Sequence, residues 1–569
     1  MILQSLTKLY DDLYLAGKLS KPGWSSQKVG FLISLDDEGT ITQIIPNFES
    51  VTRGKKELMM AKEIVLPSAV NRTSGKASNF LWDNEKYMLG LGGEDAAACF
   101  ETAKAFHHEL LDSVDSEAAR AVLKFFETWN ADTEIEKVKI LTEYKDAKAN
   151  LTFRYQGKLV SEDEEIREAW QRHYDKHEGE MQQCLVTGEE DYIAKTHPKI
   201  KGIQGAQTSG AAIVSFNNES YCSYGKEQSF NAPVGESAAF AYTSALNYLI
   251  SDWENVHYLG DTCVLCWAAG AEKSYSDFFC AALFDEHRDT YTQDDIRSIV
   301  ARLVDGKPCE EVNLKPDMQF YVLGISPNAA RLSIRFFYRD TFGNLMKNVN
   351  DHHLRMEIVK PNKDPREFLS LWAAMNETVN QKSSDKKPNS VMAGATARAI
   401  FSGSMYPASL IEAVMLRIRA EREITRGRAA IIKAYYLKNE NSGCPKEVLT
   451  VGLNENSTNI PYTLGRLFSV LEALQEKANP GLNTTIKDKY YNSASASPAM
   501  IFPILDNLAQ KHLRKLDQGA KIYYDKQIMD LKGILGEEYP SRLTLAEQGS
   551  FNLGYYHQTQ KRYEKKEEK

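Results

Sequence analysis

The 569-residue chain has no long apolar run. Its first residues, MILQSLTKLYDDLYLAGKL, include Lys8, Asp11 and Asp12 where a signal peptide has an unbroken apolar stretch. The longest weakly polar stretch, AAFAYTSALNYLI, is shorter than the roughly 20 residues needed to cross a bilayer. We therefore expect a cytoplasmic protein without a membrane partner.

Cysteines are few, and their spacing is irregular. The eight cysteines show no disulfide framework. Only Cys263 and Cys266 are spaced like a metal-ligand pair, and a zinc ribbon needs a second such pair. The segment CVLCWAA is typical of a buried strand, which would turn the two thiols to opposite faces. We expect core cysteines, no bound metal and no cofactor.

Recognisable catalytic motifs are also missing. The glycine-rich segments GLGGED and GIQGAQTSG do not end in the Gly-Lys-Ser/Thr of a phosphate-binding loop. His173 and His177 are spaced i, i+4 like metal ligands on a helix, but Tyr174 stands where the zinc-peptidase motif has glutamate. No Gly-x-Ser-x-Gly elbow is present. We expect a protein that is not an enzyme.

Two kinds of regular pattern are present, and they divide the chain. VGFLISL, GAAIVSFN, TCVLCWAA and QFYVLGIS are strand-like, whereas AACFETAKAFHHELLDSV has helical spacing. Strand signals nearly vanish after about residue 365, and four amphipathic stripes follow between 464 and 556. We predict an α+β fold with a mixed α/β region over 1–378, a linker and basic helical segment over 379–446, and a four-helix bundle over 447–569.

A net charge of −8 argues against a protein that coats nucleic acid all over, but local basic tracks remain. In SPNAARLSIRFFYRD, strand alternation places Arg331, Arg335 and Arg339 on one face. This pattern suits a phosphate backbone, and the alternative is a ladder of surface ion pairs.

Two further basic tracks lie elsewhere in the chain. A helix over RIRAEREITRGRAAIIKAYYLK would align Arg419, Arg422 and Arg426 in one stripe. In YIAKTHPKIKGIQGAQ, Lys199 and Lys201 precede a glycine-rich stretch with two glutamines. Separate basic tracks without a catalytic constellation indicate a nucleic-acid-binding protein.

The stretch NRTSGKASNFLWDN joins a polar, basic loop to an aromatic plug. Small and basic residues over 71–78 are typical of an exposed loop, whereas Phe80, Leu81 and Trp82 call for burial. The stretch is either an exposed loop on a rigid base or a turn packed by its own aromatic residues.

These stretches, taken together, resemble the large subunit of the type I-C CRISPR Cascade surveillance complex. The residues that carry the resemblance are PSAVNRTSGKASNFLWDN, CLVTGEE, HPKIKG with GAAIVSFN, SYGKEQSFNAPVG, SPNAARLSIRFF, YPASLIEAVMLRIR and FNLGYYHQ. Each is weak alone, but seven in order over more than 450 residues are specific.

The resemblance implies a non-catalytic subunit that recognises the protospacer-adjacent motif (PAM) in duplex DNA, helps to open the target and holds the guide and target strands. Its implied partners are the other Cascade subunits, the crRNA, double-stranded target DNA and the Cas nuclease-helicase that it recruits. Base pairing reads the target, while the protein reads a short duplex motif. The resemblance also implies that the C-terminal region is made separately as a small subunit.

With the family in view, we expect nucleic-acid contacts from Asn71, Arg72, Thr73, Ser74, Gly75, Lys76, Asn79, Lys199, Lys201, Gln204, Gln207, Asn328, Arg331, Arg335, Arg419, Arg422 and Arg426. Asparagine and arginine are apt groove readers, and glycine permits close approach. Two alternatives of another class stay open. One is a metal-dependent nuclease that uses His173 and His177, and the other is a scaffold that contacts only protein.

Overall fold

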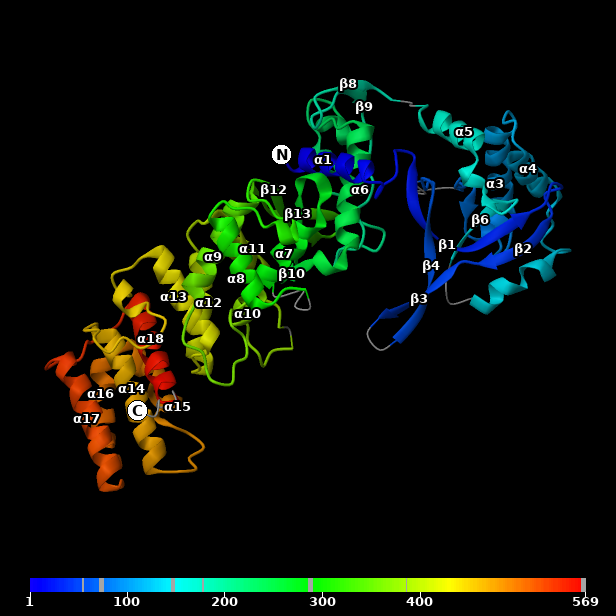
Figure 1. The fold of residues 1–569 in the computed structure, drawn as a ribbon. Coiled ribbons are helices and arrows are strands. Elements are labelled where there is room, and N and C mark those ends of the chain that lie inside the picture. The colour runs from blue at the N-terminus through cyan, green and yellow to red at the C-terminus, as the bar shows by residue number, and fades with distance from the viewer. Residues whose placement is uncertain are drawn as a thin grey trace. The chain divides into compact units, whose positions relative to one another are not determined.

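The computed structural model divides the chain into two compact units. One comprises Met1–Pro198 and Val214–Leu246, and the other comprises Lys199–Ile213 and Asn247–Lys569. Figure 1 labels their helices and strands. No helix among the described residues is long and apolar enough to span a bilayer. The described residues are 1–53, 56–70, 76–144, 149–176, 179–284, 290–384 and 386–563.

The first unit is built on a seven-stranded sheet around β1 (Trp24–Leu35). β1 pairs antiparallel with β2 and β4 and parallel with β6. The predicted strand VGFLISL forms the C-terminal half of β1, where Val29, Phe31, Ile33 and Leu35 are buried. The remaining strands are β2 (Ile41–Pro46), β3 (Phe48–Arg53), β4 (Lys56–Pro67), β5 (Trp82–Asp83), β6 (Asn150–Tyr155) and β7 (Lys158–Leu159).

Helices pack on this sheet through one aromatic core. Phe80, Phe100, Phe125, Phe153 and Trp170 all belong to it. Serine and aspartate caps, suited to helix starts, fix the beginnings of α4 and α5. The helices and short strands of this unit are α1 (Ile2–Leu15), α2 (Glu85–Leu89), α3 (Ala96–Leu111), α4 (Glu117–Thr128), α5 (Glu164–Tyr174), β8 (Met181–Gln183), β9 (Glu190–Tyr192) and the first part of α6 (Glu236–Ser251).

The second unit contains a four-stranded antiparallel sheet in the order β10–β11–β12–β13. β11 (Thr262–Ala268) is the predicted strand TCVLCWA, and all of its residues are buried. The thiol of Cys266 lies 3.9 Å from that of Cys280 inside the core, which confirms core cysteines here. The other strands are β10 (His257–Leu259), β12 (Gln319–Asn328) and β13 (Arg331–Thr341).

Helices cover this sheet, and the same core continues to the C-terminal helices. Figure 1 shows α7, α9 and α11 beside β10–β13, and α14–α18 grouped together. The helices are α7 (Lys273–Phe284), α8 (Gln293–Val304), α9 (Phe342–Met356), α10 (Leu371–Asn376), α11 (Ser390–Ser402), α12 (Ala408–Glu421), α13 (Arg426–Asn439), α14 (Ile460–Ala478), α15 (Ile486–Ala496), α16 (Pro498–Leu513), α17 (Gln518–Leu535) and α18 (Leu545–Lys561).

Two glycines let α14 and α18 cross in direct backbone contact. A Cβ on Gly465 would collide with the carbonyl oxygen of Phe551, and one on Gly554 would collide with that of Tyr462. Polar side chains close the same interface: the Tyr555 hydroxyl donates to Glu472 at 2.5 Å. The motif FNLGYYHQ is therefore the packing face of α18.

The α+β class is confirmed, and three local predictions differ from the structure. GAAIVSFN is not a strand: it contributes only isolated bridges at Ala211 and Ala212. The C-terminal region has five helices rather than four, because the short polar helix α15 carries no clear apolar stripe. The compact units do not follow the expected boundaries at 378 and 446, because one core joins β10–β13 to α18.

Candidate nucleic-acid interface

The aromatic plug of the predicted loop is buried, as expected. Phe80 and Leu81 are fully buried, and Trp82 is 3% exposed. The Phe80 ring stacks on Trp170 with centroids 5.4 Å apart, and the indole N–H of Trp82 donates to the Pro67 carbonyl at 2.8 Å. This plug joins the strand end before the loop to the residues after it, so the base of the loop is rigid.

Asn79 stabilises the base of the loop and is not part of an exposed surface. Its side-chain oxygen accepts the N–H of Val70 at 2.9 Å, and its own N–H donates to Asp83 at 3.0 Å. Asn79 is 5% exposed, so its amide is committed inside the protein. Lys76 is exposed. Outside the described residues lie Asn71, Arg72, Thr73, Ser74 and Gly75.

A buried histidine fixes a left-handed residue in the plug. Leu81 has φ +65°, a conformation that is costly for a residue with a side chain. Its N–H donates to Nε2 of His107 at 2.8 Å, and its carbonyl accepts the Thr152 hydroxyl at 2.9 Å. Nδ1 of His107 donates to the Ala103 carbonyl at 2.7 Å. Burial lowers the pKa of His107 to about 4, which keeps the ring neutral and able to accept.

In the second unit, the structure brings together two segments that are far apart in the sequence. Ala212 forms a parallel bridge with Arg331, and its N–H donates to the Ala330 carbonyl at 3.0 Å. The Leu332 N–H returns a bond to Ala212 at 2.9 Å. The predicted site residues of 199–207 therefore belong to the same surface as the β12–β13 turn.

The main chain of the 199–210 loop is held by two side chains, and Ile200 and Ile203 of the loop are buried. Asn247 accepts the Lys201 N–H at 2.9 Å and donates to the Lys199 carbonyl at 3.2 Å. The Tyr258 hydroxyl accepts the Gln204 N–H at 3.0 Å. We call the exposed lysine, glutamine and asparagine side chains of this loop and turn the loop–turn surface; they are Lys199, Lys201, Gln204, Gln207 and Asn328.

Sequence reasoning did not identify Asn247 and Tyr258, the two side chains that hold this loop. They lie 46 and 54 residues along the chain from their partners, in a helix and a strand with no special spacing. No local pattern marks either residue. Only the fold shows that they support the loop.

The expected alignment of Arg331, Arg335 and Arg339 on one face of β13 is wrong, because a β-bulge interrupts the strand alternation. The register shifts opposite Gly324 and Ile325, so Arg335 lies against Gly394 of α11, as does Phe336. Arg335 forms an ion pair with Asp261 at 3.7 Å. Arg339 instead donates to Gln319 at 3.0 Å and lies over the Tyr321 ring. The arginines therefore do not form one continuous face, and Arg331 remains with the loop–turn surface.

The expected arginine stripe over 417–438 is also interrupted. α12 ends at Glu421, Arg422 takes the left-handed conformation at φ +57°, and α13 begins at Arg426. Arg419 is exposed and donates to Gln548 at 2.8 Å, and Arg422 is exposed. Thr425 caps the start of α13, and this capping residue is the sequence feature that indicates two helices instead of one.

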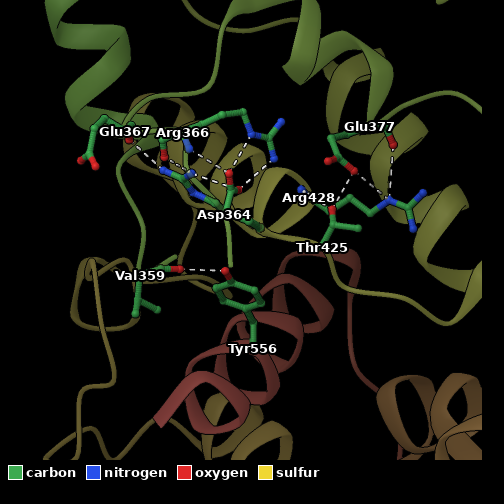
Figure 2. A network of polar contacts seen from close by, with 9 residues as sticks. Val359, Asp364, Arg366, Glu367, Glu377, Thr425, Arg428 and Tyr556 are labelled. Atoms are coloured by element: carbon green, nitrogen blue, oxygen red, sulfur yellow. Dashed lines mark hydrogen bonds and ion pairs between the residues drawn. The ribbon is translucent and has the colours of Figure 1, made fainter. Parts of the chain in front are cut away.

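Arg426 is buried and links the start of α13 to residues 364–367. It donates to Asp364 at 3.1 Å and to the carbonyls of Arg366 and Glu367 at 2.6 and 2.8 Å. Hydrogen bonding from Arg366, with that from Arg426, holds the pKa of Asp364 well below its usual range. Figure 2 shows these contacts beside Tyr556, whose hydroxyl donates to the Val359 carbonyl at 2.7 Å.

Arg428, which the sequence did not single out as a structural residue, extends this network. Its guanidinium contacts Glu421 and the carbonyls of Glu423 and Glu377, and its side chain is 2% exposed. The Thr425 hydroxyl donates to Glu377 at 2.6 Å (Figure 2). Arg428 stands two residues after the start of α13, and nothing in the sequence at that position indicates that its side chain is buried.

Of the two histidines of the alternative metal site, only His173 lies in the described part of the chain. His173 lies on α5 with its ring stacked on Trp170 at 5.6 Å, and His177 lies outside the described residues. Within the described part of the chain, no three His, Cys, Asp or Glu side chains gather as metal ligands would.

The sequence was compared with family models and with curated proteins. A model described as CRISPR-associated protein (Cas_Csd1) matches residues 6–563. The chain belongs to this CRISPR-associated family. No curated protein matches. The Cas_Csd1 match spans both compact units, so the loop base and the loop–turn surface both lie within the matched residues.

Proposed function

We propose that this CRISPR-associated protein is the non-catalytic large subunit of a type I-C Cascade complex. In this role it recognises the PAM in duplex DNA, helps to open the target, holds the guide and target strands and recruits the Cas nuclease-helicase. The family match over 6–563 supports a CRISPR role, and the resemblance of seven ordered motifs supports the specific subunit.

The loop–turn surface is the observation that carries the proposal. It presents two lysines and three amide side chains from a loop whose backbone is tied down by Asn247 and Tyr258. Lysines contribute sequence-independent attraction to phosphates, whereas amides can read base edges. A fixed backbone with exposed polar side chains allows both kinds of contact.

The left-handed turn of this loop brings it close to β12. Gly205 has φ +86°, and a Cβ there would lie 3.3 Å from Cγ of Pro327. A larger residue would be strained, so the loop is shaped by its glycine as well as by its contacts. This geometry keeps Gln204 and Gln207 on either side of a tight bend.

The loop base of the first unit is the second element of the proposal. We infer that residues 71–79 approach the duplex, with Lys76 exposed and the Phe80–Trp82 plug as the rigid support. Because Asn79 is buried, its contribution is to fix the loop rather than to touch a base.

Co-purification tests the proposal. The tagged chain, expressed with its genomic neighbours, should carry a small guide RNA and other Cascade subunits. Recovery of the chain without RNA or Cas partners would contradict the proposal. Divalent-metal-dependent DNA cleavage by the purified chain, abolished by His173→Ala with His177→Ala, would instead support the nuclease alternative.

A further inference from the structure

A cavity of about 540 Å³ lies inside the second unit, away from the loop–turn surface residues. Its walls come from α8, α9 and residues 357–369, which we call the strap, with Arg426 and Val451 completing it. This volume is within the range of about 300–1,000 Å³ typical of small-molecule sites.

One side of the cavity holds a carboxylate between two cations. Glu367 of the strap pairs with Lys360 at 2.5 Å and with Arg297 of α8 at 3.7 Å. All three side chains are partly exposed, with 36% of Lys360 and 65% of Arg297 accessible. The Glu367 carboxylate thus occupies a position that favours an anionic group, and it can move out to solvent.

A neutral imidazole, the ring of His353, lines the same cavity. Nε2 of His353 is buried and has no hydrogen-bond partner among the described residues. Such orphaned atoms are uncommon in protein interiors. The His353 ring stacks on Phe368 with centroids 4.8 Å apart. Burial lowers the pKa of His353 to about 4, so the neutral ring can donate or accept.

Part of the cavity wall is apolar. Ile296, Val300, Val349 and Ile358 line it. A second carboxylate, Glu357, is also at the wall, and the cations Arg297, Lys360 and Arg426 outnumber the two glutamates. A ligand that suits this lining combines an anionic group with a flat, apolar-faced and hydrogen-bonding one.

The strap is fixed before any ligand arrives. Arg426 binds the carbonyls of Arg366 and Glu367, and Tyr556 of α18 binds the carbonyl of Val359 (Figure 2). The Val359 N–H also donates to the Val451 carbonyl at 2.8 Å. A wall held at both ends costs a ligand little ordering entropy.

We propose that this cavity binds a single nucleotide, with its phosphate between Arg297 and Lys360 in place of the Glu367 carboxylate and its base against the apolar wall, where a turn of the His353 ring brings the unpartnered Nε2 to the base. Arginine and lysine together suit phosphate oxygens. The nucleotide is either a free nucleoside monophosphate or the phosphorylated end of a strand, because both offer the same chemistry.

Calorimetric titration of the purified full-length chain tests this site. The probes are the four nucleoside monophosphates, a 5′-phosphorylated trinucleotide, inorganic phosphate and an unphosphorylated nucleoside. We expect a nucleotide to bind more tightly than phosphate or nucleoside alone. Arg297→Ala with Lys360→Ala should weaken binding by at least about tenfold, because each lost charge-assisted contact is strong.

Two conservative variants separate the halves of the site. Glu367→Gln should tighten binding, because it removes the competing carboxylate. His353→Phe should keep phosphate binding but reduce the preference among bases. Arg302→Ala, on an exposed position of the same helix α8, is the matched control and should change nothing. The midpoint of thermal unfolding of each variant shows whether it is folded.

The outcomes distinguish the sources of the ligand. Binding of mononucleotides supports a free nucleotide, and binding of the trinucleotide alone supports a strand end. Phosphate binding as tight as nucleotide binding would overturn the assignment of the base to the His353 side. Absence of binding by every probe, in a folded chain, would overturn the site.

Discussion

Nε2 of His107 accepts the main-chain N–H of Leu81 at 2.8 Å, deep in the first unit. Leu81 is left-handed and fully buried, so a neutral imidazole holds a strained residue at the base of the predicted PAM loop. The same strand end carries Trp82, which is tied to Pro67 on the other side of the loop. His107 on α3 therefore stabilises the backbone conformation of Leu81, just after the loop.

This contact predicts an acid-sensitive first unit. Burial lowers the folded-state pKa of His107 to about 4, below the usual value of about 6.5. The unfolded chain therefore binds the proton first, and stability is complete above about pH 6.5 and falls as the pH drops towards 4. The contribution is about 3 kcal/mol.

Urea unfolding, monitored for the first unit at several pH values, measures this effect. His107→Gln should lower stability at neutral pH and flatten its decline between pH 6.5 and 4. His108→Gln, at a partly exposed neighbour on the same helix whose ring contacts Asp112, is the control. An equally steep decline in His107→Gln would show that another group is responsible.

The glycines of the α14–α18 crossing give a second prediction. Gly554→Ala should be strongly destabilising, by about 3 kcal/mol or more, because its methyl group would overlap the Tyr462 carbonyl and force the helices apart. Gly533→Ala in α17 is the matched control: its Cβ meets open space, so it should stabilise by about 0.5–1 kcal/mol. Thermal unfolding of both variants decides. A neutral Gly554→Ala would mean that the helices do not cross as described.

Burial of Arg426 gives a third prediction. Its removal takes the second arginine donor from Asp364 and leaves the carbonyls of Arg366 and Glu367 without the guanidinium that they accept from, so Arg426→Ala should cost about 3–5 kcal/mol. Arg366 is the more exposed partner of Asp364, because 44% of the Arg366 side chain is accessible. Arg366→Ala should therefore cost about 1 kcal/mol or less. Chemical denaturation of the full chain compares them. Equal costs would contradict a structural role specific to Arg426.

The C-terminal helices carry the small-subunit prediction. We expect residues 447–569 to be made separately from an internal start and to join the complex in more than one copy, as the resemblance implies. Such a product would lack the partners of Tyr556 and Ser550, which bond to Val359 and Gly443 in the full chain. Its α18 would then need another surface to cover that face.

Native mass spectrometry of the purified complex tests this expectation. A species with the mass of the C-terminal region, present in several copies, is the expected result. If every C-terminal peptide belongs to full-length chain, residues 447–569 have no separate role.

Sequence patterns were sufficient where an element carries a clear apolar run or stripe. The strand VGFLISL, the all-buried strand TCVLCWA and the stripes of α14 and α18 follow directly from their patterns. The aromatic plug was also predictable, because Phe80 and Trp82 have no other stable place.

The site was less predictable, for reasons of long-range geometry. The bulge that turns Arg335 towards Asp261 depends on the register with β12, which alternation alone does not encode. Arg426 looked like part of an exposed stripe, but a cap at Thr425 starts a new helix and turns it inward. Asn247 and Tyr258 gain their role only from folding.

The measurement that tests the central claim most directly is the affinity of the assembled complex for PAM-bearing duplex at several salt concentrations. Lys199→Ala with Lys201→Ala should weaken binding to all sequences alike and reduce the salt slope by roughly one per lost phosphate contact. Gln204→Ala with Gln207→Ala should keep the slope but cost about 1–3 kcal/mol of discrimination between PAM and non-PAM duplex. Lys446→Ala, an exposed lysine paired with Glu440, is the control. Unchanged slope and discrimination in both double variants, with the complex intact, would contradict the account.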